Sequence, residues 1–462
     1  MRAVSPVTTR TVASRPALAL LAAALPLAPL SGLEAKPQVY VAPFYANTDA
    51  LNPQGKPLGT VLASKPALST VPGSKAWRIA YVSSDAANRP TVVTALIAVP
   101  EGTAPAGGRP LLAWAHGTTG TARRCGPSQL PQPAQPLNEY FLPSGTSYSD
   151  FGLPAMTALI RKGYSIVATD YQGLGGPGDH QYGLHRTAAY DVINSIRAAR
   201  SFKPAQAGDQ AVIMGWSQGG GAVLMAAGLN DYVKKQNGAA AVNLVGVVGL
   251  APSDARVANP GGATNEAEAQ QKLAAFTKLL AGSDASLTHL SMFYWGVAAG
   301  NPDLRLSDVF TANNLPTLST LMRNKCVHEL GASYSYTYGN NLFGIFNAKP
   351  THALAWTRAI NKDLVASDQP LAPVLITWGN HDTVVPPVMH QVYAKSACAK
   401  GANITRVELP GNNTHFTTPT ASEPFYLPWI TARFAGRVAV NGCASLQSTS
   451  TRSTTTSTSP AR

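Results

Sequence analysis

The segment AVIMGWSQGGG (residues 211–221) joins a short apolar run to a glycine-rich turn, and an Ala-rich stretch typical of a helix follows it. Its centre, Gly215-Trp216-Ser217-Gln218-Gly219, has the form G-x-S-x-G. A serine on a sharp turn between a strand and a helix adopts strained backbone angles, and small residues two positions before and after it leave room for the turn. We therefore predict that Ser217 is a nucleophile. The alternative is a glycine-rich turn with a purely structural role.

Apolar runs typical of strands alternate with helical segments on both sides of this turn. Continuous apolar runs are expected for strands covered on both faces, and their alternation with helices predicts a mostly parallel sheet with crossover helices. The predicted fold class is therefore α/β. The predicted strands are Thr91–Val99, Pro110–Ala115, Tyr164–Thr169, Ala211–Met214, Leu244–Leu250 and Val374–Trp378, and the predicted helices include Met156–Lys162 and Thr187–Phe202.

The length and composition require a large core. The chain has 462 residues, of which 45% are hydrophobic and 13% are charged, and it contains 4 Cys. These values exclude a disordered or fibrous protein and a small domain held together by disulfides. Residues 252–368 contain no apolar run that would continue the sheet, so we interpret them as an inserted helical cap. The predicted core then comprises residues 36–251 and 369–446.

Both ends of the sequence are predicted to lie outside this fold. In residues 1–35, Arg2, Arg10 and Arg15 precede an apolar stretch at 17–30 that is too short to span a bilayer as a helix. This pattern is typical of a secretory signal peptide, which predicts an extracellular or periplasmic protein. Residues 447–462 are rich in Ser and Thr and offer little apolar surface to bury, so we expect a disordered tail.

The net charge is +13, from 36 basic and 23 acidic residues. The basic residues are scattered, and the middle of the chain has no cluster denser than an adjacent pair such as Lys234-Lys235. The sequence contains no basic helix, zinc finger or interleaving of aromatic and basic residues. We therefore expect no nucleic-acid partner, and we attribute the surplus charge to solubility or to attraction toward an anionic surface.

A nucleophilic serine needs a base that takes its proton and a carboxylate that orients the base. In folds with a G-x-S-x-G turn the chain order is serine, acid, histidine. Asp382 lies in the turn after the predicted strand at 374–378, and His415 follows the next apolar run. We predict Asp382 as the acid and His415 as the base. The alternatives are a turn-capping role for Asp382, with Glu408 as a distant second acid, and a surface-loop role for His415. His390 is interpreted as a surface residue.

Acyl transfer also requires two N–H donors, because negative charge develops on the carbonyl oxygen in the transition state. The amide of Gln218 is predicted as one donor, since it lies at the start of the helix that follows the serine. The other donor is expected at Thr118 or Thr119, in the loop HGTTG (116–120) after the strand at 110–115.

No metal or other cofactor is expected. The histidines show no H-E-x-x-H spacing, and the four cysteines are far apart rather than arranged as C-x-x-C.

Several motifs together resemble those of the secretory lipase family of the Candida antarctica lipase A type, in its bacterial branch. They are WAHGTTGTARRCGPS (114–128), ATDYQGLGGPGDH (168–180), GWSQGGG (215–221) and WGNHDTVVPP (378–387) followed by THF (414–416). The resemblance implies an α/β-hydrolase fold with a helical cap over the acyl-binding site, and hydrolysis of carboxylic esters that include lipids. It also implies a triad of Ser217, Asp382 and His415, and oxyanion-hole positions at Thr118, Thr119 and Gln218.

The same resemblance implies how the cysteines pair, with Cys125 bonded to Cys326 and Cys398 bonded to Cys443. By the sequence alone, four cysteines permit three pairings, and free thiols remain an alternative. Export would make disulfides plausible.

The expected activity is therefore two-step hydrolysis of a small-molecule or lipid ester, with transient contact to a lipid interface; the sequence does not indicate an oligomeric state. Aromatic residues of the insertion, such as Phe293 and Trp295, are candidates for the acyl pocket, although aromatics at such spacing are more often core. The rivals are a serine peptidase or amidase, a polyester hydrolase, and a non-catalytic secreted binding protein. The last is disfavoured because each catalytic position holds a competent residue.

Overall fold

The computed structural model describes residues 43–142, 145, 148–234, 238–254, 262–280, 283–365 and 368–448. The predicted signal peptide at 1–35 lies outside these residues, as does all but the first two residues of the predicted tail at 447–462. Within the described ranges, none of the helices combines the length and the hydropathy needed to cross a membrane.

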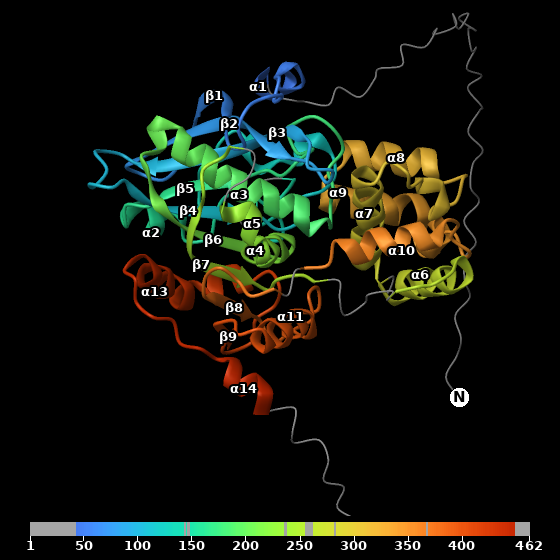
Figure 1. Cartoon of the computed structure of the whole chain (residues 1–462). Helices are drawn as coiled ribbons and strands as arrows, with labels where there is room; N and C mark the ends of the chain where they lie inside the picture. The colour runs from blue at the N-terminus through green and yellow to red at the C-terminus, as the bar shows by residue number, and fades with distance from the viewer. Residues whose placement is uncertain are drawn as a thin grey trace, which may run out of the picture. The chain divides into compact units, whose positions relative to one another are not determined.

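The six predicted strands and three further strands form one nine-stranded sheet with the order β1-β2-β3-β5-β4-β6-β7-β8-β9 (Figure 1). Neighbouring strands are antiparallel from β1 to β5 and parallel from β5 through β4 to β9, so the predicted mostly parallel sheet is confirmed. The strands are β1 Val61–Ala67, β2 Ser74–Ser84, β3 Pro90–Pro100, β4 Arg109–Ala115, β5 Ser165–Thr169, β6 Ala207–Trp216, β7 Asn243–Leu250, β8 Val374–Trp378 and β9 Ile404–Glu408.

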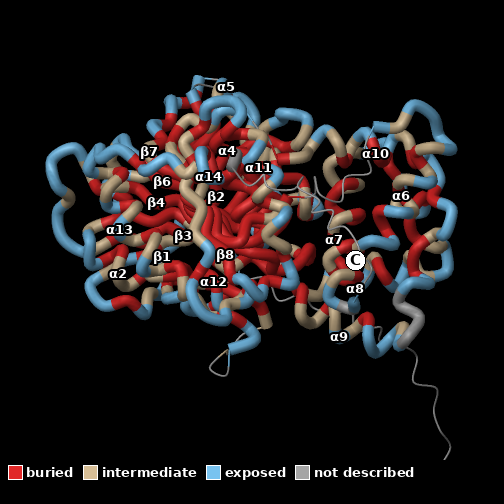
Figure 2. The backbone as a smooth tube through the Cα atoms, turned by 90° about the horizontal axis from the view of Figure 1, so that it is seen from below, coloured by how far each residue is buried: buried red, intermediate tan, exposed pale blue. Residues whose placement is uncertain are grey.

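Helices cover both faces of this sheet, which explains why its central strands are continuous apolar runs. In β4, Leu111 and Ala113 pack into one hydrophobic cluster while Leu112 and Trp114 pack into another, as the two-residue period of a strand requires. Figure 2 shows the buried residues concentrated along the strands. The first cluster includes side chains of α3 (His185–Ser201), α4 (Gln218–Gly228), α11 (Val388–Ala399) and α14 (Cys443–Ser448), and the second includes those of α2 (Met156–Arg161) and α13 (Glu423–Phe434).

In the described residues between β7 and β8 the chain forms five α-helices, inside the predicted insertion, and Figure 1 shows them grouped together. They share a hydrophobic cluster of their own, in which Tyr294, Trp295 and Tyr334 are buried. These aromatic side chains therefore belong to the core of the inserted helices. The helices are α6 Glu266–Leu280, α7 Asp284–Gly300, α8 Leu315–Asn324, α9 Val327–Tyr338 and α10 Ala353–Lys362; the short helices elsewhere are α1 Pro43–Ala46, α5 Asn230–Lys234 and α12 Thr418–Ala421.

Three strands, β1, β2 and β9, were not predicted from the sequence. β1 and β2 extend the sheet on the antiparallel side, and β2 pairs with β3 along its whole length. In β1, VLASKPA, most side chains are partly or fully exposed and Pro66 interrupts the run, so the pattern carries little strand signal. An edge position tolerates such a sequence because one side of the strand has no partner to pair with.

Candidate active site

Ser217 forms the turn between β6, which ends at Trp216, and α4, which begins at Gln218. Its backbone angles, φ 57° and ψ −118°, are strained for a residue other than glycine. A Cβ atom on Gly215 would lie 2.2 Å from the carbonyl oxygen of Gly219, and one on Gly219 would lie 2.0 Å from the carbonyl oxygen of Ala115. Both glycines are therefore required by close backbone approach, which is the reason the motif was predicted to need small residues there.

Asp382 and His415 meet at the carboxyl ends of β8 and β9. The Nδ1 atom of His415 lies 2.7 Å from Oδ2 of Asp382, and both side chains are almost completely buried. The other carboxylate oxygen of Asp382 accepts hydrogen bonds from the amides of Val384, at 2.9 Å, and Val385, at 2.7 Å. Because both of its oxygens accept hydrogen bonds, the carboxylate is fixed in orientation. The Nε2 atom of His415 does not contact Asp382, so it can interact with another group.

Trp216, the residue before Ser217, connects the serine turn to the Asp382–His415 pair. The indole N–H of Trp216 donates a hydrogen bond of 3.2 Å to the carbonyl of His415, and the two rings lie 5.2 Å apart. In the described part of the chain, no hydrogen bond joins the Ser217 hydroxyl to His415. Catalytic hydrogen bonds are often long in the absence of substrate and tighten in the reacting complex, so the arrangement remains compatible with a serine and its base.

The two segments predicted to supply N–H donors also lie together. The close approach of Gly219 to Ala115 sets the first turn of α4 against the end of β4, where the HGTTG loop begins. A Cβ atom on Gly117 would lie 2.8 Å from the Trp216 ring, so this loop packs directly on the serine turn. The hydroxyl of Thr118 is 3.0 Å from that of Tyr182.

Two buried histidines, His116 and His180, contact the loops next to the serine turn. Burial lowers the pKa of His116 to about 4, and its Nδ1 atom lies 2.6 Å from the Gly117 carbonyl. Burial likewise lowers the pKa of His180 to about 4, and its Nε2 atom lies 3.3 Å from the side-chain nitrogen of Gln218. Both imidazoles are neutral at pH 7 and organise the loops on either side of the serine turn.

The interpretation of His390 as a surface residue is wrong. Its side chain is fully buried in α11, where its ring lies 4.9 Å from that of Trp378. Arg406 approaches its Nδ1 atom at 3.2 Å. The position of His390 near the start of a helix did not indicate that its side chain is buried. The strand that covers it, β9, comes from a segment that follows the helix in the chain.

Sequence reasoning also did not single out Tyr182 and His180, which contact predicted oxyanion-hole residues. The signal was present, since His180 ends the motif ATDYQGLGGPGDH at 168–180 and Tyr182 follows two residues later. That loop had no assigned chemistry, so its polar residues could not be linked to the HGTTG loop before the fold was known.

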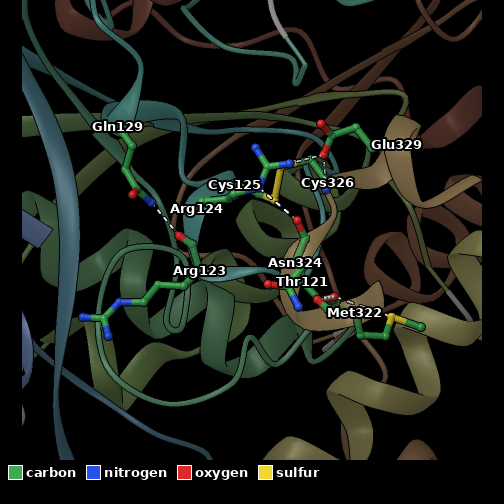
Figure 3. Close-up of a disulfide and its surroundings, with 9 residues drawn as sticks. All are labelled: Thr121, Arg123, Arg124, Cys125, Gln129, Met322, Asn324, Cys326 and Glu329. Carbon is green, nitrogen blue, oxygen red and sulfur yellow. Dashed lines mark hydrogen bonds and ion pairs between the residues drawn. A yellow bond between two sulfur atoms is a disulfide. The ribbon is translucent and has the colours of Figure 1, made fainter. Parts of the chain in front are cut away.

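Both disulfides join the cysteines that the family resemblance pairs. Cys125 is bonded to Cys326 across 201 residues of sequence, and Cys398 is bonded to Cys443 across 45. The first connects the segment after the HGTTG loop to the residue before α9, as Figure 3 shows. In the ranges that the structure describes, no group of three or more His, Cys, Asp or Glu side chains is arranged to hold a metal ion.

Comparison with known proteins places the chain in a family. The secretory lipase family model matches residues 143–442, which is more than half of the chain. The chain belongs to the secretory lipase family. Lipase 5 of Candida albicans, which is similar to this secretory lipase, is 22% identical over 413 residues, covering 84% of this chain and 80% of that one.

Solved structures show the same fold. Candida antarctica lipase A in its closed state has a TM-score of 0.64 and 18% identity, covering 86% of this chain and 87% of that one. The rice cell wall degrading esterase LipA from Xanthomonas oryzae has a TM-score of 0.57 and 18% identity, covering 82% of this chain and 98% of that one. The fold is therefore that of an α/β-hydrolase, and this member of the secretory lipase family is a carboxylic ester hydrolase.

Proposed function

We propose that this ester hydrolase works by two-step acyl transfer through Ser217, His415 and Asp382. His415 takes the proton of the Ser217 hydroxyl while the serine oxygen attacks the ester carbonyl carbon. The carbon–oxygen bond to the alcohol then breaks, and the alcohol leaves with the proton returned by His415. Water, deprotonated by the same histidine, hydrolyses the acyl-enzyme and regenerates the serine. The observation that carries this proposal is the buried contact of 2.7 Å between Asp382 and His415, beside the strained serine turn.

The negative charge of each tetrahedral intermediate would be bound by the amide of Gln218 and by the Thr118–Thr119 segment. Gln218 is the first residue of α4, so its amide has no partner within the helix and lies at the positive end of the helix dipole. In related chemistry, removing one such donor lowers the rate about 100- to 1000-fold.

The remaining features support a secreted enzyme with a cap. The family is a secretory one, and two disulfides suit an oxidising compartment. We assign residues 1–35 to a signal peptide, residues 36–251 and 369–446 to the hydrolase core, and residues 252–368 to the cap that binds the acyl chain.

A covalent probe tests the nucleophile. A fluorophosphonate should label the wild-type protein at a single serine and should not label Ser217→Ala, whose ester hydrolysis should fall at least about 1000-fold because no acyl-enzyme forms. Ser253→Ala is a matched control, because this serine neighbours the same turn through the hydrogen bond from its amide to the Ser217 carbonyl at 3.0 Å. Equal labelling of Ser217→Ala and wild type would show that the nucleophile is another residue.

A panel of p-nitrophenyl esters with acyl chains of increasing length, run beside peptide amides and a soluble polyester fragment, defines the substrate. We expect ester turnover to exceed amide turnover, because the chain belongs to a lipase family. Preferential amide turnover would favour a peptidase on the same fold, and preferential polyester cleavage would place the enzyme with polymer hydrolases.

A further inference from the structure

The loop that follows β4 is fastened to the inserted helices by its backbone. The carbonyl of Thr119 accepts a hydrogen bond of 2.9 Å from the amide of Val327, the first residue of α9. Two residues later the hydroxyl of Thr121 donates to the Met322 carbonyl, at the end of α8, over 2.7 Å. The strand-like pairing of Gly120 with Cys326 lies between these two bonds. Three successive positions of the loop are thereby held by one short segment of the insertion.

A disulfide and an ion pair close the same contact, as Figure 3 shows. Cys125 is bonded to Cys326, with 5.5 Å between their Cα atoms. Arg124 donates from Nε to the Asn324 carbonyl at 3.0 Å and forms an ion pair with Glu329. The Glu329 carboxylate also accepts the amide of Cys326 at 3.0 Å and so caps the N-terminus of α9. Glu329 and Cys326, which form the N-terminal cap of α9, therefore also bind the segment that follows the HGTTG loop.

Gly120 shows how closely the two segments approach. Its φ is 137°, and a Cβ atom there would lie 2.9 Å from the Cα atom of Cys326 and 3.1 Å from the sulfur of Cys125. Any side chain at this position would push the loop away from the insertion. The orientation of the peptide group between Thr119 and Gly120 is consequently set by α9 and by the disulfide.

Thr118 is held from a second inserted helix. Its hydroxyl lies 3.0 Å from that of Tyr182, whose pKa is raised to about 12 by burial, so that the phenol stays protonated. The backbone of Tyr182 packs against α7 so tightly that a Cβ atom on Gly296 would lie 2.1 Å from the Tyr182 carbonyl oxygen. The position of Tyr182, and through it that of Thr118, depends on α7.

We propose that the inserted helices position the second oxyanion donor: α9 and the Cys125–Cys326 disulfide hold Thr119, and α7 holds Thr118 through Tyr182. This inference rests on the proposed acyl-transfer function. An oxyanion donor must lie about 2.7–3.1 Å from the developing charge, and a misplacement of about 1 Å can cost about 100-fold in rate. The backbone amide of Val327, the hydroxyl of Tyr182 and the disulfide are accordingly positioning groups that act through the loop. The insertion thus completes the catalytic machinery in addition to covering it.

One substitution removes the decisive hydrogen bond with little damage to the fold. Val327→Pro deletes the amide that bonds Thr119, and proline is well tolerated at the first position of a helix. The preceding residue, Cys326, already has the extended angles φ −81° and ψ 168° that proline favours in its neighbour. Val327→Ala is the matched control, because it trims the same side chain and keeps the amide.

We expect Val327→Pro to lower kcat for a short p-nitrophenyl ester about 10- to 100-fold with KM changed less than about 3-fold. The affinity for a boronic acid, which forms a tetrahedral adduct on serine, should fall by the same factor as kcat/KM. Val327→Ala should stay within about 3-fold of wild type in both measurements. A proline variant with wild-type kcat, or an alanine variant that loses as much, would overturn the proposal.

A second pair of variants tests the disulfide. Cys125→Ser with Cys326→Ser should lower kcat and weaken boronic acid binding, whereas Cys398→Ser with Cys443→Ser should lower only the thermal unfolding temperature. If the first pair does not fold, Tyr182→Phe, which removes a single hydroxyl, still tests the α7 contact and should reduce kcat about 3- to 10-fold with KM preserved. Wild-type kcat in Tyr182→Phe would refute that contact.

The fluorophosphonate reaction separates the two proposals. A wild-type protein that fails to react would contradict Ser217 as the nucleophile. A wild-type protein that reacts, together with positioning variants that react and turn over at the same rate as wild type, would contradict only the role of the insertion.

Discussion

His390 is a titratable residue that the fold buries beside a positively charged side chain. Its Nε2 atom is buried without a hydrogen-bond partner among the described residues, and Arg406 faces its Nδ1 atom. Burial, and secondarily the charge of Arg406, lowers the pKa of His390 to about 3. The folded protein therefore holds this ring neutral at every pH at which the enzyme would be assayed.

His390 should make stability depend on pH. Between the unfolded pKa of about 6.5 and the folded pKa of about 3, the unfolded chain binds one more proton at this residue than the folded chain does. The free energy of unfolding contributed here is fully present above about pH 6.5 and falls by about 1.4 kcal/mol per pH unit below it. His390→Gln should flatten urea-unfolding free energies across that range. An equal slope in His390→Gln and wild type would contradict the assignment.

The residues of the candidate triad could be predicted from the sequence because the expected chain order excludes most of the histidines as the base. The order of serine, acid and histidine leaves few histidines, and the structure places Asp382 and His415 in contact. Their catalytic roles stay predictions. The burial of His390 and the contact of Tyr182 with Thr118 could not be foreseen, because both depend on segments that only the folded chain brings together.

At the scale of elements, the approach of α4 to β4 is controlled by glycine. A Cβ atom on Gly219 would lie 2.0 Å from the Ala115 carbonyl oxygen and 2.6 Å from that of His116, and backbone atoms on both sides leave no flexible side chain to move. Gly331, inside α9, has as its nearest neighbour the hydroxyl of Thr288, at the ordinary contact distance of 3.4 Å.

Alanine substitutions at these two glycines should act in opposite directions. Gly219→Ala should cost about 1–3 kcal/mol of stability and reduce ester hydrolysis, because it pushes the first turn of α4 away from β4. Gly331→Ala should gain about 0.5–1 kcal/mol, since it restricts the unfolded chain and fits the helix. Thermal unfolding and p-nitrophenyl acetate hydrolysis measure both effects. A Gly219→Ala protein with wild-type stability and activity would show that the α4–β4 contact is looser than the structure describes.

The strands that form continuous apolar runs were predictable, and those without such a run were not. The central parallel strands are buried on both faces and read as apolar runs, so their positions follow from the sequence. β1 and β2 lie on the antiparallel side: most side chains of β1 are partly or fully exposed, and the apolar run of the mostly buried β2 is broken by Lys75 and Arg78. The helices α6 to α10 fall within residues 252–368, where the absence of a strand pattern predicted an insertion, but no pattern in the sequence indicated how these helices pack.

For the whole molecule, the Cys398–Cys443 disulfide ties the C-terminal α14 to α11. The chain-entropy account predicts a contribution of up to about 4 kcal/mol for a loop of this length, and measured values are often smaller. Cys398→Ser with Cys443→Ser should therefore lower the unfolding free energy by about 2–4 kcal/mol in urea while ester hydrolysis at 25 °C is retained. Loss of activity before any loss of secondary structure would mean that α14 contributes to the site.

The order of the cysteines along the chain has a consequence for biogenesis. Cys125 pairs with the next cysteine, Cys326, and Cys398 pairs with the last, Cys443. A chain that emerges N-terminus first into an oxidising compartment presents each cysteine to its correct partner before the following pair exists. Production in a foreign host should then require an oxidant but no disulfide isomerase, because no premature bond has to be exchanged.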